Sequence, residues 1–313
     1  MKNSKQSNNY LTISGNAYMD SIVSLNQIFK PNPNLKDKID FEKISDGVRY
    51  RFQSTSQFGS THLKIFIAIL SVFSDFNSSF KVNKNCNNQE IGDLRKSLYK
   101  GIDDDNTILY SEFYVADILR IAGLNQGGTQ IKQFLNVMEN LSNFTISYQS
   151  DESASTIFLI SYKLTKKKEE KYKKAKIKVV LNSVSSSIIL GIANYARYLN
   201  VVDFSKLSSD PEIFTFVYLS WWVFEGKKSK ISIDKLCRHI YLNFDELNES
   251  TQRSHRSSVR KALITINELD GWEIEITGRG KKVMVDVSRE SSSARKKRME
   301  DVVFPLLKKA ANF

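Results

Sequence analysis

The sequence has few of the residues that build metal sites and disulfides. It contains two cysteines and three histidines in 313 residues. Cys86 and Cys237 lie far apart and neither belongs to a Cys-x-x-Cys pair, so we expect neither a structural zinc site nor a disulfide framework. The histidines are too scattered for a metal site or for the histidine cluster of a nicking enzyme. The composition therefore predicts no bound metal.

Long hydrophobic runs and nucleotide-binding signatures are also missing. The longest apolar run, residues 65–70, is too short to span a bilayer, and the N-terminus has no apolar signal core. The loop at 123–129 lacks the lysine of a phosphate-binding loop. The acidic run at 103–105 could suggest a nuclease or primase, but its neighbours Gly101 and Asn106 favour an exposed turn. We expect a cytoplasmic protein with no membrane contact, no cofactor and no enzymatic activity.

Positive charge is what the chain has in excess. Its 46 lysines and arginines against 34 acidic residues give a net charge of +12. This balance favours a polyanionic partner, because cations that bind phosphates release the counterions of a nucleic acid. Nine lysines and two glutamates crowd into residues 163–178. Such a run is typical of a solvated linker or of the edges of two strands.

Residues 230–287 carry the most informative pattern. Lys230–Ile233 alternates like a short strand, and Asp234 can cap the helix that follows up to Ile240. A second helix is expected at 250–266, with Ser250 or Thr251 as its N-cap. Its apolar residues share one face, since they recur at helical spacing, and they are Val259, Ala262, Leu263 and Ile266. A hairpin at 271–287 with a basic, glycine-bearing tip completes a predicted DNA-binding winged helix.

Cations flank the apolar stripe of this second helix. A projection at 100° per residue places Arg253, Arg256, Ser257 and Arg260 together beside the stripe, whereas His255 projects toward the apolar side and is expected to pack there. An arginine can pair with guanine O6 and N7 or with phosphate, and the hairpin tip would lie near the backbone or minor groove. The predicted DNA-binding residues here are Thr251, Gln252, Arg253, Arg256, Ser257, Arg260, Lys261, Arg279, Lys281 and Lys282.

A similar order of elements occurs earlier in the chain. Asp46-Gly47 between alternating runs predicts a hairpin at 39–52. Helices are expected at 61–74, 114–122 and 127–141, followed by a hairpin at 144–162. The helix at 127–141 exposes polar residues with one cation, and the hairpin turn is acidic. This unit therefore either binds DNA weakly or mediates self-association, and its candidate contacts are Lys132 and Gln133.

The expected fold class is α+β, with two tandem winged-helix domains that each contain a helix-turn-helix and a β-hairpin wing. At 313 residues the chain is long enough for two domains. We expect an N-terminal arm with a β-hairpin at 1–57, a first winged-helix domain at 58–176, a second at 177–289 and a basic tail at 290–313. Pro211 suits the first turn of the helix that opens the second domain.

The order of these segments resembles the IncQ-type plasmid replication initiators (the RepC family) and, more distantly, the TrfA-like initiators. The resemblance is clearest over Lys178–Asn182, Val202–Ser209 and Lys228–Asp286, and looser over 39–53, 59–65 and 119–128. It implies tandem winged helices that bind directly repeated sites (iterons) in double-stranded DNA at a plasmid origin. It also implies help in opening an adjacent AT-rich segment and recruitment of the replicative helicase of plasmid or host.

Two functions stay open at this point. The first is an origin-binding initiator that acts as a monomer on repeats and forms a homodimer off DNA. The alternative is a winged-helix transcriptional regulator that binds a palindromic operator as a symmetric dimer. Two unlike units within one chain favour the initiator, because together they can read one asymmetric site.

Overall fold

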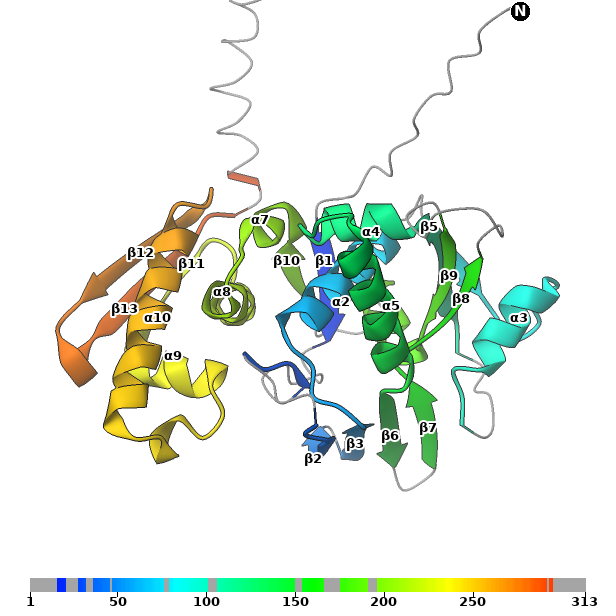
Figure 1. The fold of residues 1–313 in the computed structure, drawn as a ribbon, viewed down its shortest axis with the longest axis horizontal. Helices are drawn as coiled ribbons and strands as arrows, with labels where there is room; N and C mark the ends of the chain where they lie inside the picture. Colours follow the sequence, from blue (N-terminus) through cyan, green and yellow to red (C-terminus); the bar gives the residue numbers. More distant parts are fainter. Residues whose placement is uncertain are drawn as a thin grey trace, which may run out of the picture. The chain divides into compact units, whose positions relative to one another are not determined.

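The computed structural model describes residues 16–20, 28–31, 36–45, 47–75, 79–100, 106–149, 154–165, 175–190, 196–291 and 293–294. The chain divides into two compact units, Met1–Lys206 and Leu207–Phe313 (Figure 1). Each unit has its own set of buried apolar side chains. The acidic run at 103–105, the first nine residues and the tail from 295 onward lie outside the described residues.

The second unit follows the order that residues 230–287 predict. Its elements are α8 (Asp210–Trp222), β11 (Lys227–Ser232), α9 (Ile233–Ile240), the 3-10 helix η2 (Phe244–Glu246), α10 (Glu249–Asn267), β12 (Trp272–Thr277), the 3-10 helix η3 (Gly280–Lys282) and β13 (Met284–Arg289). The three strands form one antiparallel sheet in the order β11-β13-β12. This arrangement is compatible with a winged helix.

Helix α8 begins and packs as its sequence indicates. Ser209 caps it by accepting from the amide of Glu212, whose carboxylate accepts from the amide of Ser209 at 3.0 Å, and Pro211 lies in the first turn as predicted. The helix buries Ile213 and Val217 and packs on α10. The predicted stripe of α10, Val259, Ala262, Leu263 and Ile266, is fully buried.

The described strands of the first unit form three sheets. Its elements are β1 (Asn16–Asp20), β2 (Ile39–Ser45), β3 (Val48–Ser54), α2 (Ser60–Phe73), β4 (Phe80–Val82), α3 (Gln89–Lys96), β5 (Ile108–Tyr114), α4 (Val115–Ile121), α5 (Gly128–Ser142), β6 (Thr145–Gln149), β7 (Ala154–Phe158), β8 (Ile160–Thr165), β9 (Lys176–Leu181), α6 (Ser183–Ile189), β10 (Ala196–Asn200) and α7 (Val201–Lys206). The sheets have the orders β1-β10, β2-β3-β6-β7 and β4-β5-β9-β8.

Helix α2 forms the core of this unit. Every residue from His62 to Phe73 is buried, as expected for a helix that is apolar on nearly all sides. Helices α4 and α5 both pack on it, and in Figure 1 the strands β5, β9 and β8 lie on one side of α5 while β6 and β7 lie at its end. The predicted helix at 61–74 is confirmed.

The predicted hairpin at 39–52 is confirmed, but it is not part of a separate arm. Strands β2 and β3 pair antiparallel, and Gly47 takes the left-handed conformation (φ 78°) that the turn requires. Strand β3 continues the sheet by pairing with β6. Residues 39–54 therefore belong to the first unit.

The predicted boundary at 176/177 is wrong. Strand β9 pairs with β5 on one side and β8 on the other, and its run Ile177, Val179, Val180 and Leu181 is buried. A strand inside a sheet cannot begin another domain, so the boundary falls between Lys206 and Leu207. The lysine-rich segment 163–178 thus connects two paired strands; its residues 166–174 lie outside the described ones.

Two further expectations for the first unit need correction. The hairpin predicted at 144–162 is divided between two sheets, because β7 ends at Phe158 while β8 begins at Ile160 and pairs with β9. The stretch 81–107, for which the sequence predicts no helix or strand, contains α3 and most of β4. None of the helices described has the length and apolar character needed to cross a membrane.

Candidate nucleic-acid interface

Helix α10 divides its cations between an exposed face and a buried face. Arg253, Ser257 and Lys261 are exposed and recur every four residues, and Arg260 is half-buried beside them. Arg253 Nη2 lies 3.1 Å from Glu249 Oε1, but these side chains are 73% and 58% exposed. An ion pair this open to water is weak and leaves the guanidinium available to another anion. We call Arg253, Ser257, Arg260 and Lys261 the exposed strip.

Arg256 lies on the other face, where it is paired inside the unit, and not in the exposed row of DNA-binding residues in which the sequence places it. Its side chain is 9% exposed, and its Nε donates to Asp234 Oδ1 at 2.6 Å while Nη2 donates to Oδ2 at 3.1 Å. The hydrogen bond to Asp234 raises the pKa of the guanidinium above its ordinary value. The guanidinium also stacks over the ring of Phe244, 5.2 Å from its centroid. Arg256 therefore fixes α10 to α9.

Gln252 is also part of this internal network. Its Oε1 accepts from Arg256 Nη2 at 3.1 Å, and its Nε2 donates to the carbonyl of Leu247 at 2.9 Å. Tyr241 and His255 stack with 3.7 Å between ring centroids, which confirms that His255 packs, and burial lowers the pKa of His255. Gln252 and His255 thus hold the turn between the two helices.

The helix caps differ from the predicted ones. Asn248 caps α10: its Oδ1 accepts from the amide of Thr251 at 2.9 Å and from the Thr251 hydroxyl at 3.0 Å. Ser232 caps α9 by accepting from the amide of Lys235 at 3.2 Å. Asp234, the predicted cap, is bound to Arg256 instead. Thr251 therefore serves the local structure of the helix start.

The β12–β13 connection forms a tight tip with exposed cations. Gly278 has φ 84°, and a Cβ there would lie 2.6 Å from the carbonyl oxygen of Lys282, so only glycine fits. Arg279 and Lys282 are exposed, as predicted. The side chain of Lys281 lies outside those that the structure describes. The tip thus offers at least two cations to a partner.

The outer face of the same sheet is neutralised. Lys230 Nζ lies 2.8 Å from Asp286 Oδ2, and Lys228 Nζ lies 3.9 Å from Glu273 Oε2. Cross-strand pairs of opposite charge are an ordinary feature of a solvated sheet face. The exposed strip and the tip are therefore better candidates for binding a polyanion than this sheet face is.

In the first unit, α5 has the place in the chain order that α10 has in the second. Lys132 and Gln133 are both exposed on it, and Gln133 Nε2 donates to Thr61 Oγ1 across a long 3.4 Å. The lysines of the described part of the 163–178 segment are all paired with carboxylates: Lys163 and Lys178 with Glu90, and Lys176 with Glu112. Helix α5 accordingly presents fewer cations than α10 does.

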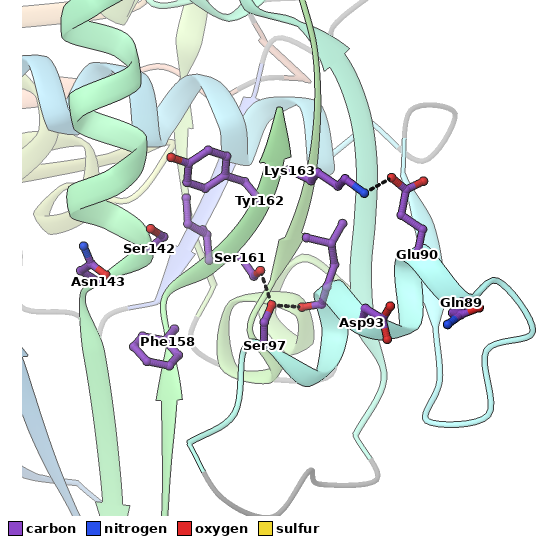
Figure 2. A pocket seen from close by; sticks show the side chains of 12 residues that line it. Gln89, Glu90, Asp93, Ser97, Ser142, Asn143, Phe158, Ser161, Tyr162 and Lys163 are labelled. Atoms are coloured by element: carbon purple, nitrogen blue, oxygen red, sulfur yellow. Dashed lines mark hydrogen bonds and ion pairs between the residues drawn. The ribbon is translucent and has the colours of Figure 1, made fainter. Parts of the chain in front are cut away.

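A cavity of about 740 Å³ lies between α3, the end of α5 and strand β8 (Figure 2). Its polar groups bind one another: the hydroxyls of Ser97 and Ser161 share a hydrogen bond, and Glu90 lies 3.0 Å from Lys163. Hydrogen bonds from Lys178 and Lys163 lower the pKa of the Glu90 carboxyl below its ordinary value. Within the described part of the chain, no group of three or more histidines, cysteines or acidic residues is placed to hold a metal.

The comparisons with known proteins identify the family. The model of replication protein C (RepC) matches residues 25–286. The match covers well over half of the sequence, so the chain belongs to the RepC family of plasmid replication initiators. None of the curated proteins compared matches the sequence.

Two solved structures of RctB have a similar fold. A selenomethionine derivative of its domains 2 and 3 shares 10% sequence identity, with a TM-score of 0.53 over 86% of this chain and 96% of that chain. A second structure of domains 2–3, also at 10% identity, has a TM-score of 0.54 over 88% of this chain and 99% of that chain. Identity this low shows the fold alone.

Proposed function

We propose that this chain initiates plasmid replication by binding directly repeated sites at the origin through two winged-helix units. The exposed strip of α10 beside the cationic tip of β12–β13 carries the proposal. Neither surface takes part in the buried Arg256–Asp234 pair or in the Lys230–Asp286 pair on the sheet face. A chain of a replication-protein family with such a surface is suited to duplex DNA.

In the proposed complex, α10 enters the major groove. Arg253 and Arg260 can each form two hydrogen bonds with guanine or phosphate, and Ser257 and Lys261 can add further contacts. Arg279 and Lys282 would contact the adjacent backbone or minor groove, and Lys281 on the same tip would add to them. Thr251, Gln252 and Arg256 would support the interface by holding α10 in place.

We assign the first unit to the same fold by its connectivity. The order α2–β5–α4–α5–β8–β9 with sheet order β5-β9-β8 parallels the order α8–β11–α9–α10–β12–β13 with sheet order β11-β13-β12. Strands β8 and β9 would then form its wing, and the β6–β7 pair would be an addition between the second helix and the wing. This parallel supports a tandem winged-helix protein.

Membership in the family supports the later steps of the proposal. Binding would help to open a neighbouring AT-rich segment and would recruit a replicative helicase of plasmid or host. The chain would act as a monomer on the repeats and form a homodimer off DNA. The proposal assigns no catalytic step to the chain.

Footprinting on the plasmid's own origin tests the proposal. At a fixed salt concentration, which must be stated because phosphate contacts depend on salt, we expect protection of direct repeats beside an AT-rich tract and none on a scrambled duplex. Protection of a single palindrome at a promoter would instead identify a transcriptional regulator. Equal binding to the origin and to scrambled DNA would contradict both functions.

A further inference from the structure

The exposed face of α5 differs in chemistry from that of α10. Thr129, Lys132, Gln133 and Asn136 are exposed and recur at helical spacing. The opposite side buries Ile131, Phe134, Val137, Met138 and Leu141 in the core of the first unit. Where α10 offers guanidinium and ammonium groups, α5 offers two amides, one hydroxyl and a single cation.

This face is not suited to a protein partner. Stable protein interfaces have an apolar centre, and all the exposed large apolar side chains among the described residues lie outside α5. Its single cation, Lys132, lies between the polar groups, and the chain as a whole carries +12. Glu139 is also exposed on α5, so the anion-compatible part is the N-terminal two thirds of the helix.

Amides and guanidinium groups recognise different bases in the major groove. An asparagine or glutamine amide can donate to N7 and accept from N6 of adenine, whereas arginine donates to O6 and N7 of guanine. Gln133 and Asn136 lie three residues apart and are both exposed, which is the spacing of neighbours on one face. To bind a base, Gln133 would have to give up its long hydrogen bond of 3.4 Å to the Thr61 hydroxyl.

We infer that the two units read different base pairs: α5 recognises A·T pairs through Gln133 and Asn136, and α10 recognises G·C pairs through Arg253. Lys132 would hold the adjacent phosphate. The inference rests on the proposed binding of duplex DNA and deepens it. Each repeat would then have one half in which α5 reads A·T pairs and one half in which α10 reads G·C pairs. Because the two halves differ, the repeat could not be a palindrome.

Purine analogues that lack N7 test this division directly. The probe is a short duplex enriched by the full chain from a random library, in which single purines are replaced by 7-deazaadenine or 7-deazaguanine. These analogues keep Watson–Crick pairing but remove the N7 acceptor. We expect one or two adenines and one or two guanines at which replacement weakens binding about tenfold.

The variants assign each penalty to a helix. In Gln133→Ala or Asn136→Ala the penalty at the adenine read by that amide should disappear while the guanine penalty remains. In Arg253→Ala the penalty at the guanine read by Arg253 should disappear while the adenine penalty remains. Each variant is thus the matched control for the other, and equal melting temperatures exclude misfolding. If no duplex is enriched, the proposed function fails. If a duplex is enriched but adenine analogues have no effect, or neither amide variant removes the penalty at any adenine, only the division of bases fails.

Discussion

The two units hold their paired helices, α4 with α5 and α9 with α10, by different means. In the second unit, α9 and α10 are joined by the Asp234–Arg256 ion pair and by the stack of Tyr241 on His255. In the first unit, α4 and α5 pack through apolar side chains on α2. Their turn contains Gly123 (φ 66°), where a Cβ would lie 2.2 Å from the carbonyl oxygen of Ser205.

This difference goes together with a difference between the exposed faces of α10 and α5. In α10 a buried cation, Arg256, joins the helices, and other cations stand on the exposed strip. Where the helices are joined by apolar packing, the exposed face is left with neutral polar groups, as on α5.

The largest effect is expected from Arg256→Ala. Removing one partner leaves the nearly buried Asp234 carboxylate unpaired (17% exposed), which costs about 3–5 kcal/mol of unfolding free energy. Amide hydrogen exchange of the full chain, followed over α9 and α10, measures this loss. Arg253→Ala removes the same charge from the exposed strip and should change stability by no more than about 0.5 kcal/mol. Equal losses in the two variants would contradict the division of α10.

The first unit should be the more sensitive to acid. Burial lowers the pKa of His62 to about 4 from 6.5, so between these pH values the unfolded chain binds the proton and the folded unit does not. Stability is therefore complete above about pH 6.5 and falls by about 3 kcal/mol as the pH falls to 4.

His62→Gln should flatten that pH dependence. Exchange over α2 measures it, because His62 Nδ1 accepts from the amide of Gly59 at 3.4 Å at the start of this helix. His239→Gln in the second unit is the control and should leave exchange over α2 unchanged at every pH. An unaltered α2 profile in His62→Gln would assign the acid sensitivity to another group.

DNA affinity should depend more on α10 than on α5. Arg253→Ala is expected to weaken binding to the enriched duplex by about 1–3 kcal/mol, measured by fluorescence anisotropy at fixed salt. Arg238→Ala is the control, because Arg238 is also exposed but is held by Asp245 at 2.7 Å. Lys132→Ala on α5, which removes one phosphate contact, should cost less than Arg253→Ala. The reverse ranking would make the first unit the main contact.

The smallest effect is expected at the tip of β12–β13. Lys282→Ala should weaken binding to all sequences similarly and lower the slope of log affinity against log salt by about 1. A titration over several salt concentrations, on the enriched and on a scrambled duplex, measures both. A loss confined to the enriched duplex would show that Lys282 reads bases.

Local patterns predicted the second unit well. The stripe of α10, the hairpin after it and the proline start of α8 all depend on residues close in sequence. Arg256 was assigned to the wrong face because a helical projection places residues around one helix but does not show the neighbouring helix. Asp234, far away in the sequence, decides where Arg256 points.

The first unit was harder to predict because its sheets depend on distant pairings. A run of lysines has the same composition whether it links two domains or joins two paired strands, and only the pairing of β9 with β5 distinguishes these cases. Helix α3 has a visible N-cap, Asn88, whose Oδ1 accepts from the amide of Ile91. Its few apolar residues form no periodic stripe, so the sequence pattern does not predict this helix.

The inward position of Arg256 has a practical consequence for plasmid design. Because Asp234, Gln252 and Arg256 join the helices without using the exposed strip, the positions 253, 257, 260 and 261 can be randomised together while the scaffold is kept. We expect such a library to yield proteins that recognise new origins. Two plasmids could then be kept in one cell, each with its own variant of the protein and a matching origin. Neither variant would bind the origin of the other plasmid.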